Sequence, residues 1–184
     1  MKKGISLLLT ISLLFILSAN VLASTPNSAF AQKAKNIYNP LLKKTVLNVS
    51  QNDVGKEYHY NSIYIPVKDL FANHVQAITW DNVRKIILVK NQGSELVLNF
   101  SGKEFKVSNN QVVLPTEWIK LENGRAGINC FVLAYIFDRN ADSLKDKERE
   151  AWKDKLSFLN IDWTDGLPGV NDGYMHVSVN YNNR

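Results

Sequence analysis

The stretch 61–89 constrains the fold most, because its hydrophobic pattern changes period within a short length. Its first apolar residues, at 63–65, are β-branched or aromatic and are typical of a strand. Pro66 follows, and proline suits the first position of a helix because it has no amide hydrogen to donate. Further apolar residues then recur at helical spacing. The expected elements are a strand at 63–65, a helix from Pro66 to about Val75, and strands at 76–80 and 85–90.

Short turns punctuate the chain on both sides of this stretch. A strand is predicted at 45–49, and the Asn91, Gln92 and Gly93 turn predicts a hairpin that pairs 85–90 with 95–100. Further short strands are expected at 104–107 and 112–114. Connections this short favour an antiparallel meander over a parallel sheet.

The second half of the chain, about 123–184, repeats the first in weakened form. Ile128 stands where Pro66 stood, and Trp163 stands where Trp80 stood. An insertion at 142–159 has apolar residues at helical spacing, with Ser143 as its N-cap, and predicts an amphipathic surface helix. The predicted fold class is therefore α+β: an antiparallel sheet curled around short helices, built from two degenerate β-α-β-β units, with the extra helix inserted in the second.

The N-terminus predicts export. Lys2 and Lys3 precede an apolar run at 5–17, as in a secretory signal. Small residues permit cleavage after Ala23 or after Ala31, and we expect cleavage after Ala31, because Pro26 lies upstream and Ala29 completes an A-x-A pattern. Gln32 would then begin the mature chain. The expected organisation is a signal peptide at 1–31, a basic linker at 32–44 and a single domain at 45–184.

The charge and the apolar pattern limit the classes of partner. Removing 1–31 takes away two lysines and no acid, which lowers the net charge from +5 to +3. This is too small an excess for a nucleic-acid-binding protein. The lysines of 32–44 fit a solvated tail or a loose attraction to an anionic wall polymer. No membrane span is expected after cleavage, and no cysteine follows the apolar run to carry a lipid, so the mature protein is expected to be secreted or associated with the cell wall.

The motif around 61–89 resembles the copper amine oxidase N-terminal domain, also called a stalk domain. The resemblance covers about 45–137 well and 161–181 loosely, although Lys68 stands where the family usually has arginine. It implies a small antiparallel sheet around a helix, in an exported accessory module whose name implies no chemistry of its own. The residues that carry the signature, in a structural role, are Pro66, Leu70, Trp80, Asp81, Gly124 and Arg125.

No residue pattern predicts catalysis. A copper amine oxidase needs three histidine ligands and a tyrosine that becomes a quinone, whereas the three histidines here are scattered and Tyr181 lacks an acidic residue after it. We therefore expect no cofactor and no metal. The only cysteine, Cys130, is flanked by apolar residues and is expected to be buried. Trp80 is expected in the core, and Trp118 is the candidate for contact with a ligand such as a sugar ring.

The favoured function is a non-enzymatic module of the cell envelope that binds a cell-wall polymer or an envelope protein. Two alternatives remain open. A small secreted hydrolase would use Cys130 or the Asp-rich loop at 162–172. A secreted interaction or inhibitor protein would act through the helix at 142–159.

Overall fold

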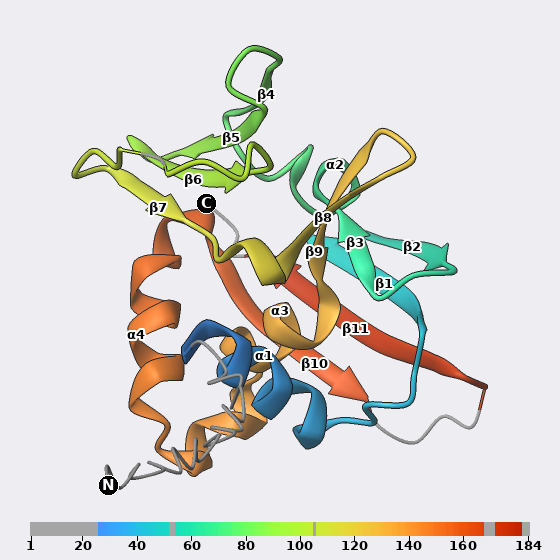
Figure 1. The fold of residues 1–184 in the computed structure, drawn as a ribbon. Helices are drawn as coiled ribbons and strands as arrows, with labels where there is room; N and C mark the ends of the chain where they lie inside the picture. Colours follow the sequence, from blue (N-terminus) through green and yellow to red (C-terminus); the bar gives the residue numbers. More distant parts are fainter. Residues whose placement is uncertain (1–25, 52–53, 105, 168–171, 182–184) are drawn as a thin grey trace, which may run out of the picture.

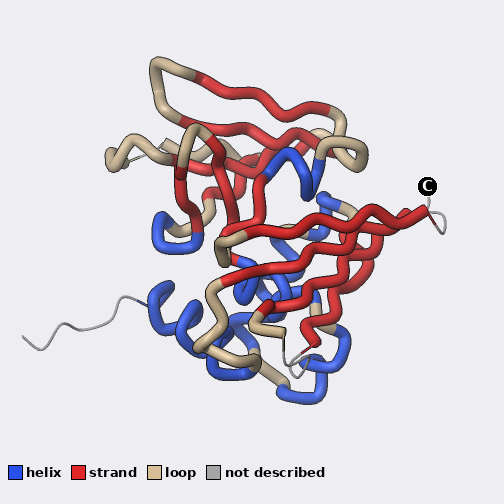
Figure 2. The backbone as a smooth tube through the Cα atoms, turned by 90° about the vertical axis from the view of Figure 1, so that its right-hand side faces the viewer, coloured by secondary structure: helices blue, strands red, loops and turns tan. Residues whose placement is uncertain are grey.

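The computed structural model describes residues 26–51, 54–104, 106–167 and 172–181, and its architecture is α+β (Figure 1). Three sheets and several short helices enclose one hydrophobic core. Most of the helical backbone gathers at one end of the molecule, and the sheet that contains β4 to β7 lies at the other (Figures 1 and 2). The helices are α1 (Pro26–Ile37), α2 (Val67–Phe71), η1 (Thr116–Trp118), α3 (Cys130–Phe137), η2 (Arg139–Leu144), α4 (Lys147–Lys155) and η3 (Ser157–Leu159).

The first sheet joins the two ends of the described chain. Its strand order is β10 (Ile161–Leu167), β11 (Tyr174–Tyr181), β1 (Lys44–Gln51) and β2 (Val54–Tyr60). The strand predicted at 45–49 is confirmed as β1. It pairs antiparallel with β2 and parallel with β11. The long crossover that a parallel pair needs is supplied here by almost the whole chain.

The third sheet corrects the predicted meander. Strands β4 (Ala77–Asp81), β5 (Ile86–Asn91) and β6 (Ser94–Asn99) are antiparallel, and the β5–β6 hairpin is confirmed. The strand predicted at 104–107 is wrong for the residues that the structure describes there. The side chain of Asn99 instead binds Ser101 and Lys103 in a loop, and this loop lets β7 (Gln111–Val113) pair parallel with β6.

The two β-α-β-β units are confirmed in their element order, β3-α2-β4-β5 and β9-α3-β10-β11. Strands β3 (Tyr64–Pro66) and β9 (Arg125–Asn129) pair antiparallel, with Ile65 opposite Ile128, and β8 (Ile119–Glu122) completes this second sheet. Pro66 is the N-cap of α2 and Asn129 is the N-cap of α3, so the equivalent of Pro66 is Asn129 and not Ile128, one residue later than predicted. The asparagine replaces the proline chemically, since its side chain accepts a hydrogen bond from the Phe131 amide at the start of α3.

Helix α3 forms the centre of the core. All eight of its residues are buried, and it contacts α1, α4 and β10. The helix after Pro66 is shorter than predicted. It ends at Phe71 and not near Val75, and the chain turns before β4. Of the described helices, none is long and apolar enough to cross a bilayer.

Helix α1 overturns the predicted basic linker at 32–44. Residues 32–37 are helical, Ala34 is fully buried, and the Tyr38 hydroxyl donates a 2.8 Å hydrogen bond to the buried Asp138 carboxylate. Phe30 is also buried, with its ring 5.0 Å from that of Trp118 and 5.5 Å from that of Tyr135. A cut after Ala31 would fall inside α1 and would remove the contacts of Phe30.

The inserted segment is three short helices, not one amphipathic surface helix. Lys145, with a left-handed φ of 48°, separates η2 from α4, and Asp146 rather than Ser143 caps α4. Arg149 is a charged residue of this segment, and it is fully buried. Its guanidinium donates to the carbonyl oxygens of Tyr135 and Asp138 at 2.7 and 2.6 Å, so the segment is fastened to the end of α3.

Candidate binding groove

Two hollows lie on either side of the β8–β9 hairpin, and we call them together the hairpin groove. The first has a volume of about 540 Å³ and the second about 780 Å³. Pro66, Arg125 and Ala126 line both. A concave surface that combines apolar floors with a few polar groups is the usual form of a ligand site.

The hairpin that divides the groove depends on two glycines. Asn123 and Gly124 have φ of 50° and 72°, which is the conformation of a two-residue turn that asparagine and glycine favour. At Gly127 a Cβ atom would lie 2.9 Å from the Cβ of Tyr64, so only glycine lets β9 approach β3 this closely. Both glycines therefore fix where Arg125 sits.

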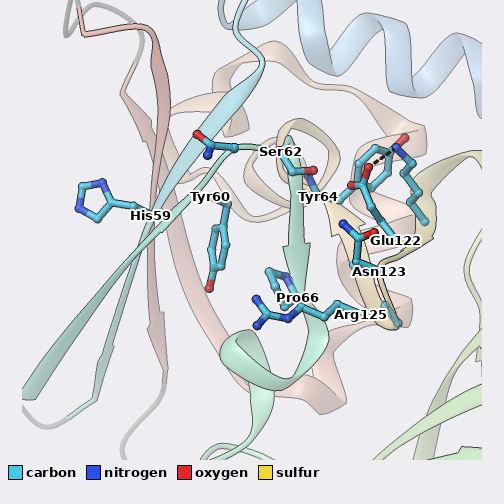
Figure 3. Close-up of a pocket in the computed structure, with 12 residues that line it drawn as sticks. His59, Tyr60, Ser62, Tyr64, Pro66, Glu122, Asn123 and Arg125 are labelled. Carbon is cyan, nitrogen blue, oxygen red and sulfur yellow. Dashed lines mark hydrogen bonds and ion pairs between the residues drawn. The ribbon is translucent and has the colours of Figure 1, made fainter.

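The first hollow is polar and aromatic (Figure 3). The Tyr60 hydroxyl donates a 2.9 Å hydrogen bond to Asp69, and burial together with this carboxylate raises the pKa of Tyr60. Lys120 pairs with Glu122 at 3.0 Å, and its ammonium lies 5.6 Å from the centre of the Tyr64 ring. These contacts leave both acidic side chains with partners inside the protein.

Arg125 differs from the other charged groups of the groove. Its side chain extends across Pro66 toward Tyr60 (Figure 3), and it is exposed. Within the described residues it makes no ion pair and no side-chain hydrogen bond of its own. A guanidinium with free donors at the wall shared by two hollows is suited to a carboxylate or phosphate group.

The second hollow is apolar and contains an exposed tryptophan. Ile78, Ile87 and Leu121 line it, and Trp80 lies among them with 44 % of its surface exposed. The prediction that Trp80 packs in the core is therefore wrong. Trp80 lies on β4, the edge strand of its sheet, and packs loosely against Phe100 with ring centres 6.3 Å apart. The side chain of its counterpart, Trp163, lies outside the described residues.

Trp118, the predicted ligand contact, is fully buried, so that prediction is also wrong. It packs against Phe30 and Trp152, and its indole nitrogen donates a 3.0 Å hydrogen bond to the Asn27 carbonyl. The position after a proline and an acidic residue gives no sign of burial. The α1 residues that contact Trp118 are Phe30 and Asn27, and both lie in the predicted signal peptide at 1–31.

The other signature residues divide between the core and the groove. Leu70 is fully buried, and Asp81 accepts hydrogen bonds from the Val83 and Arg84 amides in the β4–β5 turn. Pro66, Gly124 and Arg125 line the groove. Sequence reasoning missed Tyr60, Tyr64 and Leu121. The Asn-Gly turn offered a signal for Leu121, because residues beside a hairpin tip are commonly exposed.

The candidate reactive groups do not converge. Cys130 is fully buried, and burial raises the pKa of its thiol to about 12. His59 contacts Glu57, His176 contacts Asp172, and His74 stacks on Tyr181 with ring centres 3.8 Å apart. No three metal-ligating side chains gather in the part of the chain that the structure describes. The predicted Asp-rich loop at 162–172 is not a loop over its first part, because 162–167 belong to strand β10, and 168–171 lie outside the described residues.

The described residues form a small α+β domain whose hairpin groove is concave and partly cationic. No family model, curated protein or solved structure matches the chain. The resemblance to the copper amine oxidase N-terminal domain therefore stays a prediction that rests on its motif.

Proposed function

We propose that the chain is a non-enzymatic, extracytoplasmic binding module and that the hairpin groove holds its ligand. The observation that carries the proposal is that an exposed Trp80 and Arg125, which has free donors, both line the second hollow. An indole face covers the apolar face of a ring, and a guanidinium binds an anionic group.

The charges of the groove favour an anionic ligand. The groove is lined by the cationic residues Lys68, Lys120 and Arg125 and by two carboxylates. Of these carboxylates, Glu122 pairs with Lys120, and Asp69 accepts a hydrogen bond from Tyr60. The chemistry that fits both hollows is an anionic cell-wall polymer whose sugar rings stack on Trp80 and whose acidic groups reach Arg125. An envelope protein with an acidic segment is the alternative occupant.

The arrangement of the lining groups supports binding rather than turnover. Ser62 accepts a hydrogen bond from the Tyr64 amide, and His59 points away from the other labelled residues (Figure 3). Among the described residues of the groove, no hydroxyl group is hydrogen-bonded to an imidazole. Nucleophilic catalysis requires such a base beside the nucleophile.

The test is retention of the purified exported chain on purified cell wall, measured across a salt titration. Trp80→Ala and Arg125→Gln should each weaken retention about tenfold, which corresponds to about 1.4 kcal/mol. The matched controls are Val83→Ala, at an exposed apolar residue near Trp80, and Lys103→Gln, which removes an exposed positive charge elsewhere. The controls should bind as the unmodified chain does.

Two results would contradict the proposal. Equal retention of all four variants would place binding outside the groove. Release of soluble fragments from the wall by the purified chain would show turnover. Capture of a discrete envelope protein, lost in the same two groove variants, would keep the groove as the site and replace the polymer by the alternative occupant.

A further inference from the structure

We propose that the export signal is removed by hydrolysis of the Ala23–Ser24 peptide bond, so that the mature protein keeps helix α1 as part of its fold. The reaction consumes one water molecule, leaves a carboxylate on Ala23 and gives Ser24 the new amino terminus. The agent is a signal peptidase, which requires small residues before the bond that it cuts. The inference replaces the predicted cleavage after Ala31 and does not depend on the ligand of the hairpin groove.

Helix α1 contributes buried side chains to the core. Phe30 is 1 % exposed and fills the space between Trp118 and Tyr135, and Ala34 is fully buried against α3. A chain that began at Gln32 would lack the Phe30 ring. The neighbouring aromatic rings would then border an open cavity, and cavities of this kind destabilise a core strongly.

Trp118 makes a hydrogen bond that exists only in the longer chain. The indole nitrogen of the buried Trp118 donates to the carbonyl of Asn27 at 3.0 Å. Removal of Asn27 would leave this donor buried or would force Trp118 into water, and either outcome is unfavourable.

The two candidate bonds differ in their position relative to helix α1. The bond after Ala31 lies in the middle of α1, which spans Pro26–Ile37. The bond after Ala23 lies before residue 26, where the described part of the chain begins. Cleavage there separates the apolar run at 5–17 from the folded part of the chain without removing any described contact. Ala23 is also the nearer of the two sites to that apolar run.

The experiment is to express the full-length chain in a bacterial secretion host and to determine the amino terminus of the exported protein by intact mass and N-terminal sequencing. The expected first residue is Ser24. A first residue of Gln32, or an exported protein that retains Met1, would overturn the inference.

A matched pair of variants tests the same point without depending on the stability of the product. Val21→Lys places a charge three residues before the Ala23–Ser24 bond, in the segment that is removed. Ala29→Lys places the same charge three residues before the Ala31–Gln32 bond, at an exposed position of α1. We expect Val21→Lys to accumulate precursor and Ala29→Lys to be processed normally to Ser24. Accumulation of precursor only in Ala29→Lys would refute the inference.

Discussion

Replacing Phe30 by alanine tests whether α1 belongs to the cooperative fold. The phenyl ring is almost completely buried and contacts two aromatic rings within 5.5 Å. Phe→Ala substitutions in protein cores reduce the free energy of unfolding by about 3–5 kcal/mol. Because α1 lies near one end of the chain and can detach, the loss is limited by the free energy of its docking, and we expect about 3 kcal/mol.

The assay is denaturant unfolding followed by tryptophan fluorescence, since Trp118 contacts Phe30 directly. For a domain of this size the same loss lowers Tm by roughly 6–12 °C. Ser28→Ala is the matched control, because Ser28 lies on the exposed face of the same helix, and its effect should stay within about 0.5 kcal/mol.

The reasoning would be refuted if Phe30→Ala changed the free energy of unfolding by less than about 1 kcal/mol. That result would mean that α1 does not dock on α3 in solution. A change equal to that of Ser28→Ala would have the same meaning. Retained stability together with an altered Trp118 emission would place Phe30 beside the indole without an energetic role.

Four further predictions follow from single contacts. Arg149→Ala should lower the free energy of unfolding by about 3–5 kcal/mol, because it leaves two buried carbonyl oxygens without a hydrogen-bond donor. Lys153→Ala, on the same helix, is the control and should change the free energy of unfolding by less than about 1 kcal/mol in the same denaturation assay. Gly127→Ala should destabilise the domain by about 1–3 kcal/mol and should weaken amide protection in β3, measured by hydrogen exchange, because the new Cβ would meet Tyr64. Burial alone would raise the pKa of Asp146, but the hydrogen bonds from Lys33 and Tyr135 hold this pKa at about 2. Because the pKa is depressed in the folded state, the stabilising contribution of Asp146 is present above about pH 4 and is lost as the pH falls toward 2. The decline of the free energy of unfolding on the acid side of a pH titration should therefore be shallower in Tyr135→Phe. Cys130 should resist alkylation at pH 8 in the native protein and react once denaturant is added, and rapid native labelling measured by mass would contradict its burial.

Local patterns explain the parts of the fold that the sequence predicted correctly. The Gln92–Gly93 pair adopts left-handed conformations that few residues tolerate, so the hairpin between β5 and β6 is visible in the sequence. The order of elements in both units follows from the change of hydrophobic period after Ile65 and after Ile128. These are properties of neighbouring residues, and they need no knowledge of the rest of the chain.

The errors concern contacts between distant residues. Trp118 is buried by Phe30, and Arg149 is buried by the end of α3, so neither burial follows from the local pattern. Trp80 has the sequence neighbours of a core residue, yet it lies on an edge strand with an open hollow beside it. The parallel β6–β7 pair arises because a loop replaces the strand expected at 104–107. Hydrophobic spacing identifies an apolar face but does not identify what covers it.

The hairpin groove was predictable only in part. Pro66, Gly124 and Arg125 were singled out as structural signature residues, and the structure places all three around one concave surface. Tyr60 and Tyr64 come from strands of different sheets and meet there only because β2 ends beside β3. Residues that converge from separate sheets leave no common spacing in the sequence.

The position of β1 between β2 and β11 has a consequence for how the chain folds after export. In the export that we propose, β1 leaves the membrane early, while β11, its parallel partner, is the last described strand to follow. Val46 and Leu47 are buried in the folded sheet, and their burial is complete only after β11 has paired with β1. Contacts between such distant segments form slowly, and unpaired strand edges are prone to aggregate in the meantime. A nascent chain of this protein is therefore expected to need protection on the outer side of the membrane until its final strand has been released.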